Sequence, residues 1–399
     1  MNAKRGAALI AGGGVGGLTS AIVLADAGYS VAVHERAPAL EDIGAGLQLS
    51  PNATRILDRL GVLDSLGGLA LEPLALVVRR ARDGAQLTRM ELGENARRRW
   101  GSPYLVAHRS DLLRALLVRV AAEPAISLNL DSTVRGFAVT PQGDLRVAIK
   151  RGLLRMETNA DLLIGADGLR STVRERLGLG GENDARFTGD VAWRALIPAD
   201  RAPASMRAPV TTLWLGPRGH LVHYPLRGGS VINVVLVVRD SRSAAFDSDG
   251  WNHPGDPAAI GFAVKEWAPD VGALVATAPD WRGWPLFDRP PTPEWAAGPV
   301  ALLGDAAHPM APYLAQGAAQ SIEDAAALGV ALAGRADAAE ALRAYSAARA
   351  SRAARVQTEA RRQQSTYHMR GLSAFARNLV IRAMGAERLA RRYDWLYGA

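Results

Sequence analysis

The chain has 399 residues, 48% of them hydrophobic and 22% charged, which allows a sizeable core and excludes wholesale disorder. This length is roughly two to three times that of a typical domain and favours a composite enzyme over a single binding module. Because the chain has no cysteine, disulfide frameworks, thiolate nucleophiles and Cys-ligated metal sites are excluded. The formal net charge is +8, but basic and acidic residues are interleaved, so we expect no nucleic-acid partner.

An uncharged stretch over residues 6–25 follows Lys4 and Arg5 and imitates a signal peptide or a membrane span. Five glycines lie between Gly12 and Gly17, whereas a spanning helix would be rich in Leu, Ile and Val throughout. No other uncharged apolar run approaches about eighteen residues. We therefore expect a cytoplasmic protein without a membrane partner.

The first predicted elements form a βαβ unit. Residues 7–11 are a short apolar run typical of a buried parallel strand, and residues 30–34 form a second one. Gly28 follows an apolar-periodic stretch, as a helix C-cap does. Strand, glycine loop, helix and strand within about thirty residues make a βαβ unit.

The glycine loop carries a nucleotide-binding fingerprint. Gly12, Gly14 and Gly17 fit G-x-G-x-x-G, in which the turn is tight, a Cβ would block a pyrophosphate, and free N–H groups attract its charge. Glu35 ends the second strand, where a carboxylate can accept hydrogen bonds from a ribose. This pattern predicts an adenine dinucleotide without a 2′-phosphate, because an acid at this position prefers a free 2′-hydroxyl.

After the βαβ unit, segments that mix helices and strands flank a region rich in β-strands. In chain order we expect a helix over 52–60 opened by Ser50 and Pro51, a hairpin of 76–80 and 86–92, a helix over 110–122, strands through 135–150 with a turn at 142–144, and a strand at 161–164. Between 186 and 285, β-rich runs predict an inserted antiparallel sheet, at 211–215, 220–225 and 231–238. A buried strand at 300–303, a helix from about Gln316 and a helical tail from about 340 complete the prediction.

Two further segments identify the kind of dinucleotide. Residues 165–174 read G-A-D-G-L-R-S-T-V-R, and residues 304–309 read G-D-A-A-H-P, followed by A-Q-G-A at 315–318 and E-D-A at 323–325. These match segments of flavoprotein aromatic hydroxylases. The sequence therefore closely resembles the single-component FAD-dependent aromatic monooxygenases of the salicylate hydroxylase and 3-hydroxybenzoate 6-hydroxylase group. The resemblance covers nearly the whole chain, through D-W-L-Y-G at 394–398.

The resemblance implies an α/β fold in which a Rossmann-like FAD-binding domain is interrupted by an antiparallel β-sheet substrate domain and followed by a C-terminal helical tail. The expected limits of these segments are 1–73, 99–185 and 286–340 for the FAD-binding domain, 74–98 for a hairpin of the substrate domain, 186–285 for the substrate domain itself, and 341–399 for the C-terminal helices.

The resemblance also implies how the adenosine side of FAD is held. Glu35 and Arg36 would hold the AMP half, and Arg109 would contact the cofactor too. Asp167 belongs to a segment tied to both FAD and nicotinamide binding. The alternative for Asp167 is that it caps the helix after Gly168.

The flavin side is assigned to the second half of the chain. Asp305, at the carboxyl end of a strand, would bind the ribityl chain. The helix that starts near Gln316, with Gly317 and Ala318 in its first turn, would direct its N-terminus at the flavin pyrimidine. A reduced flavin gathers negative charge there, and a helix N-terminus supplies roughly half a positive charge.

The implied reaction uses FAD as the cofactor and NADH or NADPH and molecular oxygen as co-substrates. NAD(P)H would dock transiently, so no second glycine fingerprint is needed. A flavin hydroperoxide would then attack an electron-rich carbon of a phenolic or hydroxybenzoate-like aromatic acid, while the protein supplies orientation and a dry pocket. The protein would act as a monomer or a homodimer.

Catalytic candidates lie in the substrate domain. Arg194 and Tyr224 occupy positions where related monooxygenases carry an active-site Arg and Tyr. Arg194 could instead be a strand-edge charge, and Tyr224 a sheet aromatic with a satisfied hydroxyl. His223 could act as an acid–base aid for a phenol. We expect no metal site at His220 and His223, because residues three apart on a strand lie on opposite faces.

Two positions depart from related sequences. Gln48 ends G-A-G-L-Q at 44–48, where 6-hydroxynicotinate 3-monooxygenases carry His. Because the Gln side chain cannot take a proton, this departure argues against a pyridine carboxylic acid as the substrate. Ala315 stands where many relatives have Gly, and its methyl group should stiffen the loop.

Three alternatives stay open. The same fold could act on a hydroxylated N-heterocycle or a urate-like compound, or the chain could be a non-catalytic basic binding protein with a nucleotide fold. The Arg-rich stretch over 343–362 could bind an acidic partner or DNA, but we favour a solvated helix packed on its Ala face.

Overall fold

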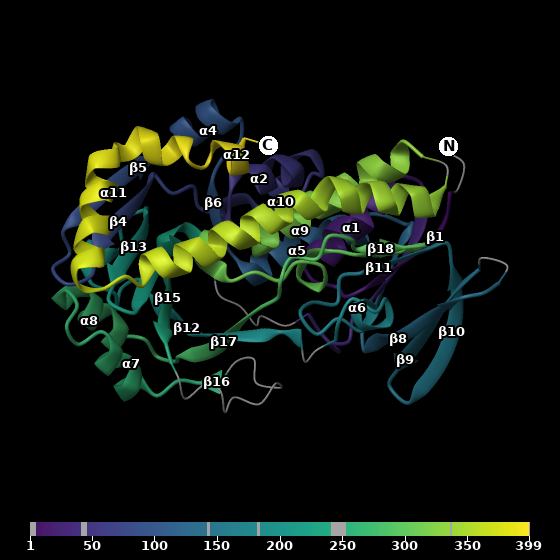
Figure 1. Ribbon diagram of the computed structural model, residues 1–399, viewed down its shortest axis with the longest axis horizontal. Coiled ribbons are helices and arrows are strands. Elements are labelled where there is room, and N and C mark those ends of the chain that lie inside the picture. The colour runs from purple at the N-terminus through teal and green to yellow at the C-terminus, as the bar shows by residue number, and fades with distance from the viewer. Residues whose placement is uncertain are drawn as a thin grey trace.

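The computed structural model describes residues 5–40, 46–141, 144–181, 184–240, 253–335 and 337–398. Two large sheets lie along the long axis of the molecule, and the C-terminal helices extend from one sheet to the other (Figure 1).

A mostly parallel sheet of six strands contains the predicted βαβ unit. Its order is β18 (Ala296–Ala297), β19 (Val300–Leu302), β11 (Leu162–Gly165), β1 (Gly6–Ala11), β2 (Tyr29–His34) and β7 (Ile126–Asn129). The central pairs are parallel, and β18 pairs with β19 in the antiparallel sense. Helices α1 (Val15–Asp26) and α9 (Gly317–Ala333) pack against each other, and α5 (Arg109–Ala121) packs against α1.

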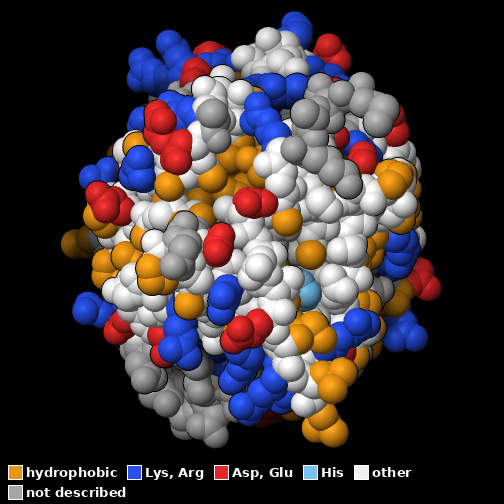
Figure 2. All heavy atoms as spheres, turned by 90° about the vertical axis from the view of Figure 1, so that its right-hand side faces the viewer, with side chains coloured by type: hydrophobic (Ala, Val, Ile, Leu, Met, Phe, Trp, Pro, Cys, Tyr) orange, Lys and Arg blue, Asp and Glu red, His pale blue; other side chains and the backbone are white. Residues whose placement is uncertain are grey.

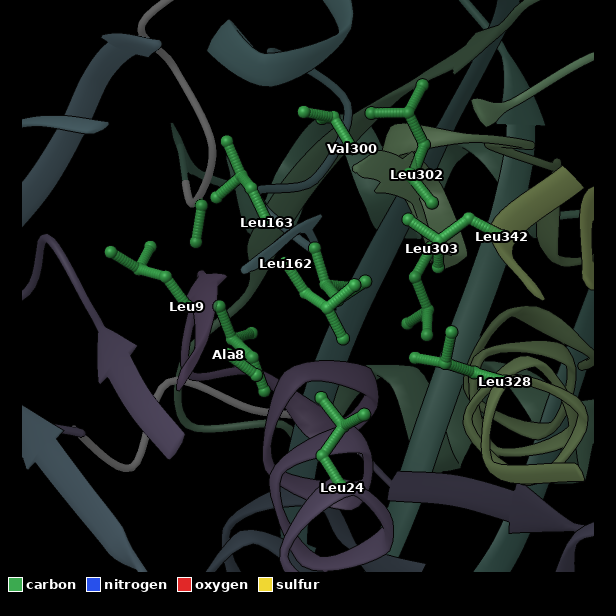
Figure 3. Packing of buried hydrophobic residues seen from close by; sticks show 14 of the residues in the cluster. Ala8, Leu9, Leu24, Leu162, Leu163, Val300, Leu302, Leu303, Leu328 and Leu342 are labelled. Carbon is green, nitrogen blue, oxygen red and sulfur yellow. The ribbon is translucent and has the colours of Figure 1, made fainter. Parts of the chain in front are cut away.

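The core of this half explains the continuous apolar runs of the parallel strands, since both faces of such a sheet are covered. Leu162 and Leu303 lie on the face toward Leu24 of α1 and Leu328 of α9, whereas Leu9, Leu163 and Leu302 from three neighbouring strands lie on the opposite face (Figure 3). The predicted strands at 7–11, 30–34, 161–164 and 300–303 are therefore confirmed to within two residues at each end.

A small antiparallel sheet contains β8 (Ser132–Val139), β9 (Leu145–Arg151) and β10 (Leu154–Ala160). Strands were expected through 135–150, but β10 was not predicted. It is an edge strand with exposed side chains along most of its length, and apolar and polar residues alternate only over its first four positions, which is too short a pattern for the prediction. Residues 142 and 143 of the predicted turn lie outside the described residues.

The second large sheet has eight strands. Its order is β16 (His253–Pro254), β17 (Arg282–Asp288), β12 (Arg186–Pro198), β15 (Val231–Arg239), β14 (Gly219–Leu226), β13 (Thr211–Gly216), β4 (Ala75–Arg80) and β5 (Gln86–Glu91). The predicted hairpin thus joins the predicted inserted sheet. The strands of the predicted inserted sheet pair in the antiparallel sense, and only the added hairpin is attached by a parallel pair, β13 with β4. These two strands are far apart in the chain, so no hairpin loop imposes an antiparallel direction.

Strand alternation gives the eight-stranded sheet two different faces. On β14, Leu221 packs in a cluster with α7 (Pro257–Ala263) and α8 (Pro269–Ala276), whereas Tyr224 packs in another cluster with Leu314. The face that carries Tyr224 therefore looks toward the FAD-binding half of the molecule.

The C-terminal tail is helical, as predicted. Helix α10 (Ala338–Tyr367) begins beside β18 and β19 and ends at Tyr367, which packs against the apolar clusters that contain Val237 and Leu213 of the other sheet. It is followed by α11 (Gly371–Arg391) and α12 (Asp394–Tyr397). The shorter elements are β3 (Gly46–Leu49), α2 (Pro51–Arg59), α3 (Leu63–Leu66), η1 (Gly67–Leu69), α4 (Glu94–Trp100), β6 (Leu105–His108), α6 (Thr172–Arg176), η3 (Ala204–Met206), η4 (Arg227–Gly229), η6 (Gly304–Ala306) and η7 (Pro312–Leu314).

In the described part of the chain, no helix combines the length and apolar character needed to cross a bilayer. On the end of the molecule shown in Figure 2, basic and acidic side chains are interspersed. The expected segment limits and the expected lack of a nucleic-acid partner stay predictions.

Candidate functional site

The glycine loop forms a cradle between β1 and α1. A Cβ at Gly12 would overlap the backbone of Ala166, and one at Gly17 would overlap the carbonyl of Gly12, so close packing requires glycine at both positions. At Gly14 a Cβ would meet nothing within 4 Å. Gly14 is also the N-cap of α1 and provides no capping side chain. Open space and free N–H groups therefore meet where a pyrophosphate would lie.

Glu35 lies at the end of β2 beside this cradle. Its Oε2 accepts a hydrogen bond from the Gly13 N–H at 2.7 Å, and its Oε1 accepts one from the Ala37 N–H at 2.9 Å. The carboxylate therefore supports the glycine turn in addition to the ribose role expected of it. Arg36 is exposed.

A groove continues from the cradle and is lined by residues from both the first and the second half of the chain. Five of the predicted cofactor residues meet in its lining: Gly14, Arg109, Asp305, Gly317 and Ala318. They come from the starts of α1, α5 and α9 and from η6. Two helix N-termini and one guanidinium favour an anionic ligand, so the residues present fit the diphosphate and flavin of FAD.

Asp305 points its exposed carboxyl into this groove. The surrounding protein raises the pKa of that carboxyl by desolvation, and His308 and Arg109 oppose this effect. The carboxyl is placed to accept hydrogen bonds from ligand hydroxyl groups.

The side chain of Asp167 is directed at α6 instead. It accepts hydrogen bonds from the Ser171 hydroxyl and, at 3.2 Å, from the Val173 N–H. Its neighbours Ala166 and Gly168 line the groove, whereas Asp167 does not. This placement fits the capping alternative, and a role for Asp167 at the cofactor stays a prediction.

A buried ion network holds the groove's loop to its helices. Asp324 of α9 accepts hydrogen bonds from the Gly304 N–H at 3.0 Å, from His308 Nε2 at 2.6 Å and from Arg349 Nε at 2.7 Å. Glu323 pairs with Arg349 and with Arg352 Nε at 2.6 Å. Burial would raise the pKa of Asp324, but His308 and Arg349 outweigh it and lower this pKa to about 2.

This network corrects the expectation for the Arg-rich stretch. The Ala face of α10 is buried, as expected, but Arg349 is buried too and Arg352 is largely so, and both bind carboxylates of α9. The chain's own acids, not solvent, surround these two arginines. The E-D pair at 323–324 and the Arg-rich run after it were the sequence signal that could have suggested ion pairs between α9 and α10.

The loop before α9 is held from the other side by α2. Gln316 is buried, donates to Ser50 Oγ at 2.8 Å and accepts from Asn52 Nδ2 at 3.1 Å. Ser50 is the N-cap residue of α2, as predicted, but its side chain makes no capping hydrogen bond. Ala315 has a left-handed φ of +53°, a conformation that favours glycine, so its methyl group constrains the loop.

A small cavity lies next to the groove, on the sheet face that carries Tyr224. Its lining mixes polar and apolar groups: Gln48, Leu76, Tyr104, Thr211, Leu213, His220, Val222, Pro312, Tyr313, Leu314, Ala315, Tyr367, Tyr393 and Tyr397. Gln48 Oε1 accepts a hydrogen bond from the Tyr104 hydroxyl at 2.7 Å, which orients the amide. Strand β3 separates the two spaces, because Leu47 lines the groove and Gln48 lines the cavity. Gly44 and Ala45 of the departing motif lie outside the described residues.

Arg194 and Tyr224 lie on the cavity face of the sheet, but neither is among the residues that line the cavity; Tyr224 is close to β3. A Cβ at Gly46 would be 2.6 Å from the Tyr224 hydroxyl. The guanidinium of Arg194 lies 4.9 Å from the centre of the Trp284 ring. Burial lowers the pKa of Arg194 to about 10, with Tyr224 opposing and Arg109 adding to the shift. Burial raises the pKa of Tyr224, and Arg194 opposes that shift.

His223 is placed differently from the expectation. It points to the other face of the sheet, where it accepts a hydrogen bond from Trp214 Nε1 at 3.1 Å and lines a separate pocket with Arg79. Burial lowers its pKa to about 3. His220 lines the cavity instead, and it was missed as a candidate. Strand alternation was the available signal, since residues 220 and 224 share a face and residues 223 and 224 cannot.

Among the described residues, no group of three His, Asp or Glu side chains is placed to hold a metal ion.

Comparisons with known proteins agree with this geometry. The family model described as "FAD binding domain" matches residues 5–360. The chain is 36% identical over 393 residues to a 3-hydroxybenzoate 6-hydroxylase of Polaromonas naphthalenivorans, covering 98% of this chain and 95% of that protein. It is also 36% identical over 391 residues to a 3-amino-4-hydroxybenzoate 2-monooxygenase of Streptomyces platensis, with coverage of 98% and 95%. A salicylate hydroxylase substrate complex superposes with a TM-score of 0.81 at 25% identity, covering 98% of this chain and 95% of the other.

Proposed function

The chain belongs to the FAD binding domain family, and we infer from this that it is an FAD-dependent monooxygenase that hydroxylates a phenolic or hydroxybenzoate-like aromatic acid. The observation that carries the proposal is the shared wall of the groove and the cavity. Leu47 faces the groove, Gln48 faces the cavity, and the loop from Ala315 to Gly317 borders both. A flavin ring in the groove and an aromatic ring in the cavity would meet across this wall.

The cavity supplies what a small phenolic ring needs. Leu76, Leu213 and Val222 offer apolar contact. Thr211 Oγ1 is buried and has no hydrogen-bond partner among the described residues, although it lines the cavity. A buried hydroxyl without a hydrogen-bond partner costs free energy. A polar substituent of a ligand that bonds to Thr211 would remove this cost and so favour binding.

The other predicted residue roles are part of the same proposal. Glu35, Arg36, Arg109 and Asp305 would hold FAD, and the start of α9 at Gly317 and Ala318 would face the flavin. Bound FAD supplies the oxygen chemistry, with NADH or NADPH and molecular oxygen as co-substrates. Tyr224, Arg194 and Gln48 would orient the substrate. A cytoplasmic monomer or homodimer is part of the same proposal.

A hydroxylated N-heterocycle is the second candidate, and one observation favours it. Gln48 cannot take a proton, but His220 lines the same cavity and can. Although position 48 is Gln rather than His, the cavity therefore still contains a side chain that can accept a proton.

Substrate-stimulated NADH oxidation across a panel of hydroxybenzoates and hydroxypyridine acids tests the proposal, with hydrogen peroxide measured beside the hydroxylated product. A true substrate couples NADH oxidation to product, whereas an effector yields peroxide. A protein that purifies without the yellow colour of bound flavin would contradict the proposal and favour a non-catalytic binding protein.

A further inference from the structure

The ring of His220 contacts a second, largely buried histidine. Its Nδ1 lies 3.1 Å from Nε2 of His368, the C-cap residue of α10, and the two ring centres are 5.3 Å apart. His220 belongs to β14 and lines the cavity. The contact therefore connects the cavity with the end of α10.

A buried carboxylate stands behind His368. Asp190 of β12 is fully buried, and its Oδ2 lies 3.7 Å from His368 Nδ1. The same Oδ2 accepts hydrogen bonds from the Tyr313 hydroxyl and, at 2.5 Å, from Gln364 Nε2. Arg239 lies 4.0 Å from Asp190 Oδ1. These donors and this cation hold the acid as an acceptor beside the imidazole pair.

Because His368 lies between His220 and Asp190, one pair of ring tautomers is favoured. If His368 donated from Nε2, its bare Nδ1 would face the Asp190 carboxylate and be repelled. If His368 carries its proton on Nδ1, that N–H faces the carboxylate across 3.7 Å, an electrostatic contact rather than a hydrogen bond, and Nε2 can accept from His220 Nδ1–H. The second arrangement leaves the Nε2 of His220 without a hydrogen.

We propose that Asp190 and His368 are positioning residues that hold His220 in the Nδ1–H tautomer, so that its bare Nε2 faces the cavity and accepts the proton of a substrate hydroxyl. In that step the O–H bond of the substrate breaks, the Nε2–H bond forms, and the positive charge of the imidazolium is stabilised by Asp190 through His368. The inference rests on the proposed function, since it assigns the proton acceptor of that reaction.

The surroundings keep both rings neutral before the substrate binds. Burial lowers the pKa of His220 well below its usual value, and His368 adds to this. Burial also lowers the pKa of His368, against the effect of Asp190 and with that of Arg239 and Arg377. Tyr313 and Tyr367 pack around the His220 ring from η7 and α10. A neutral imidazole can accept a proton, whereas an imidazolium cannot.

The tautomer can be read without any substrate. In FAD holoenzyme labelled with 15N-histidine, ring NMR distinguishes the seven histidines, and the His220→Gln variant identifies the signals of residue 220. We expect Nδ1–H with a bare Nε2 at His220. The His368→Phe variant should shift this ring toward Nε2–H, and His368→Gln should preserve the parent state, because its carbonyl can still accept from Nδ1–H. An Nε2–H tautomer in the parent protein would overturn the proposal, even if His368→Phe failed to fold.

Turnover gives an independent arm, with 3-hydroxybenzoate and NADH as the probes. His368→Phe should lower the rate of product formation by about tenfold to a hundredfold, as expected for a residue that orients an active side chain. Flavin reduction and KM should change little, peroxide should rise, and His368→Gln should recover part of the rate. Ser365→Ala, an exposed change one turn away on the same helix, should behave like the parent.

Equal losses of FAD content, flavin reduction and product in His368→Phe would indicate a merely structural role and overturn the proposal. A parent protein that hydroxylates no acid of the panel would refute the proposed function instead. The tautomer experiment would still decide whether His368 controls the tautomer of His220.

Discussion

His223 and Tyr224 are neighbours in the chain, yet their side chains lie on opposite faces of the eight-stranded sheet. His223 accepts a hydrogen bond from Trp214 beneath the sheet, and the Tyr224 hydroxyl approaches Gly46 of β3 on the cavity face. Tyr224 is therefore on the face that carries the cavity, next to its lining residues rather than among them, and His223 is on the other face.

Tyr224→Phe should fold and retain FAD, because it removes a hydroxyl and keeps the ring. We expect product formation to fall by about 10²- to 10⁴-fold, the range of positioned acid–base groups, with NADH oxidation falling less and the balance appearing as peroxide. His223→Gln should leave the coupling of NADH oxidation to product nearly unchanged. Product and peroxide assays on both variants check this. The opposite ranking would place the assisting group beneath the sheet.

Asp305→Ala should lower FAD affinity by about 1.5–3 kcal/mol, the typical worth of a hydrogen bond to a charged group. Gly14→Val should do at least as much harm, because its side chain would enter open space that the pyrophosphate needs. Gly272→Val, at another open position but in α8, is the matched control and should retain FAD. Titration of apoprotein with FAD measures all three. Parent-like affinity in the first two variants would show that the cofactor lies elsewhere.

Glu35→Ala should weaken FAD retention and leave the ratio of NADH to NADPH use nearly unchanged. The carboxylate accepts from the N–H groups of Gly13 and Ala37, so its loss also loosens the glycine cradle. Bound flavin per chain and the two nicotinamide kcat/KM values are the measurements. A switch of nicotinamide preference with normal flavin content would mean that the fingerprint binds NAD.

Arg349→Met should destabilise the fold by about 3–5 kcal/mol, since it leaves Asp324 and Glu323 buried with fewer partners. Arg343→Met, an exposed change on the same helix, should alter stability by less than about 0.5 kcal/mol. Urea unfolding of both variants gives the comparison. Equal stability would show that the buried network contributes little to the attachment of α10.

The same network predicts an acid-sensitive window. The pKa of Asp324 is lowered to about 2 in the folded protein and is near 3.8 when unperturbed, so the unfolded state binds the proton more readily. The stability from this group, about 2 kcal/mol, is present above about pH 4 and is lost as pH falls toward 2. Urea midpoints between pH 5 and 2.5 should fall in the parent and fall less in Asp324→Asn. Parallel curves would assign acid sensitivity to other groups.

Local pattern was sufficient for much of the fold. The run from β1 through the glycine turn to β2, the hairpin of β4 and β5, and the strands around His220 were predicted because turn residues and apolar period act over a few neighbours. The exposed edge strand β10 and the parallel pairing of β13 with β4 were not, because neither leaves a signal in the adjacent residues.

By itself, the sequence determined the glycine cradle, because Gly12, Gly14, Gly17 and Glu35 act through backbone geometry within one βαβ unit. Only the tertiary structure decided which face of the second sheet lies toward the groove, and hence that His220 lines the cavity and His223 does not. It also decided that Arg349 reaches Asp324 and His368 reaches His220. These contacts join residues from distant segments, and the energy that selects them comes from burial and charge pairing that form only when the helices and sheets pack.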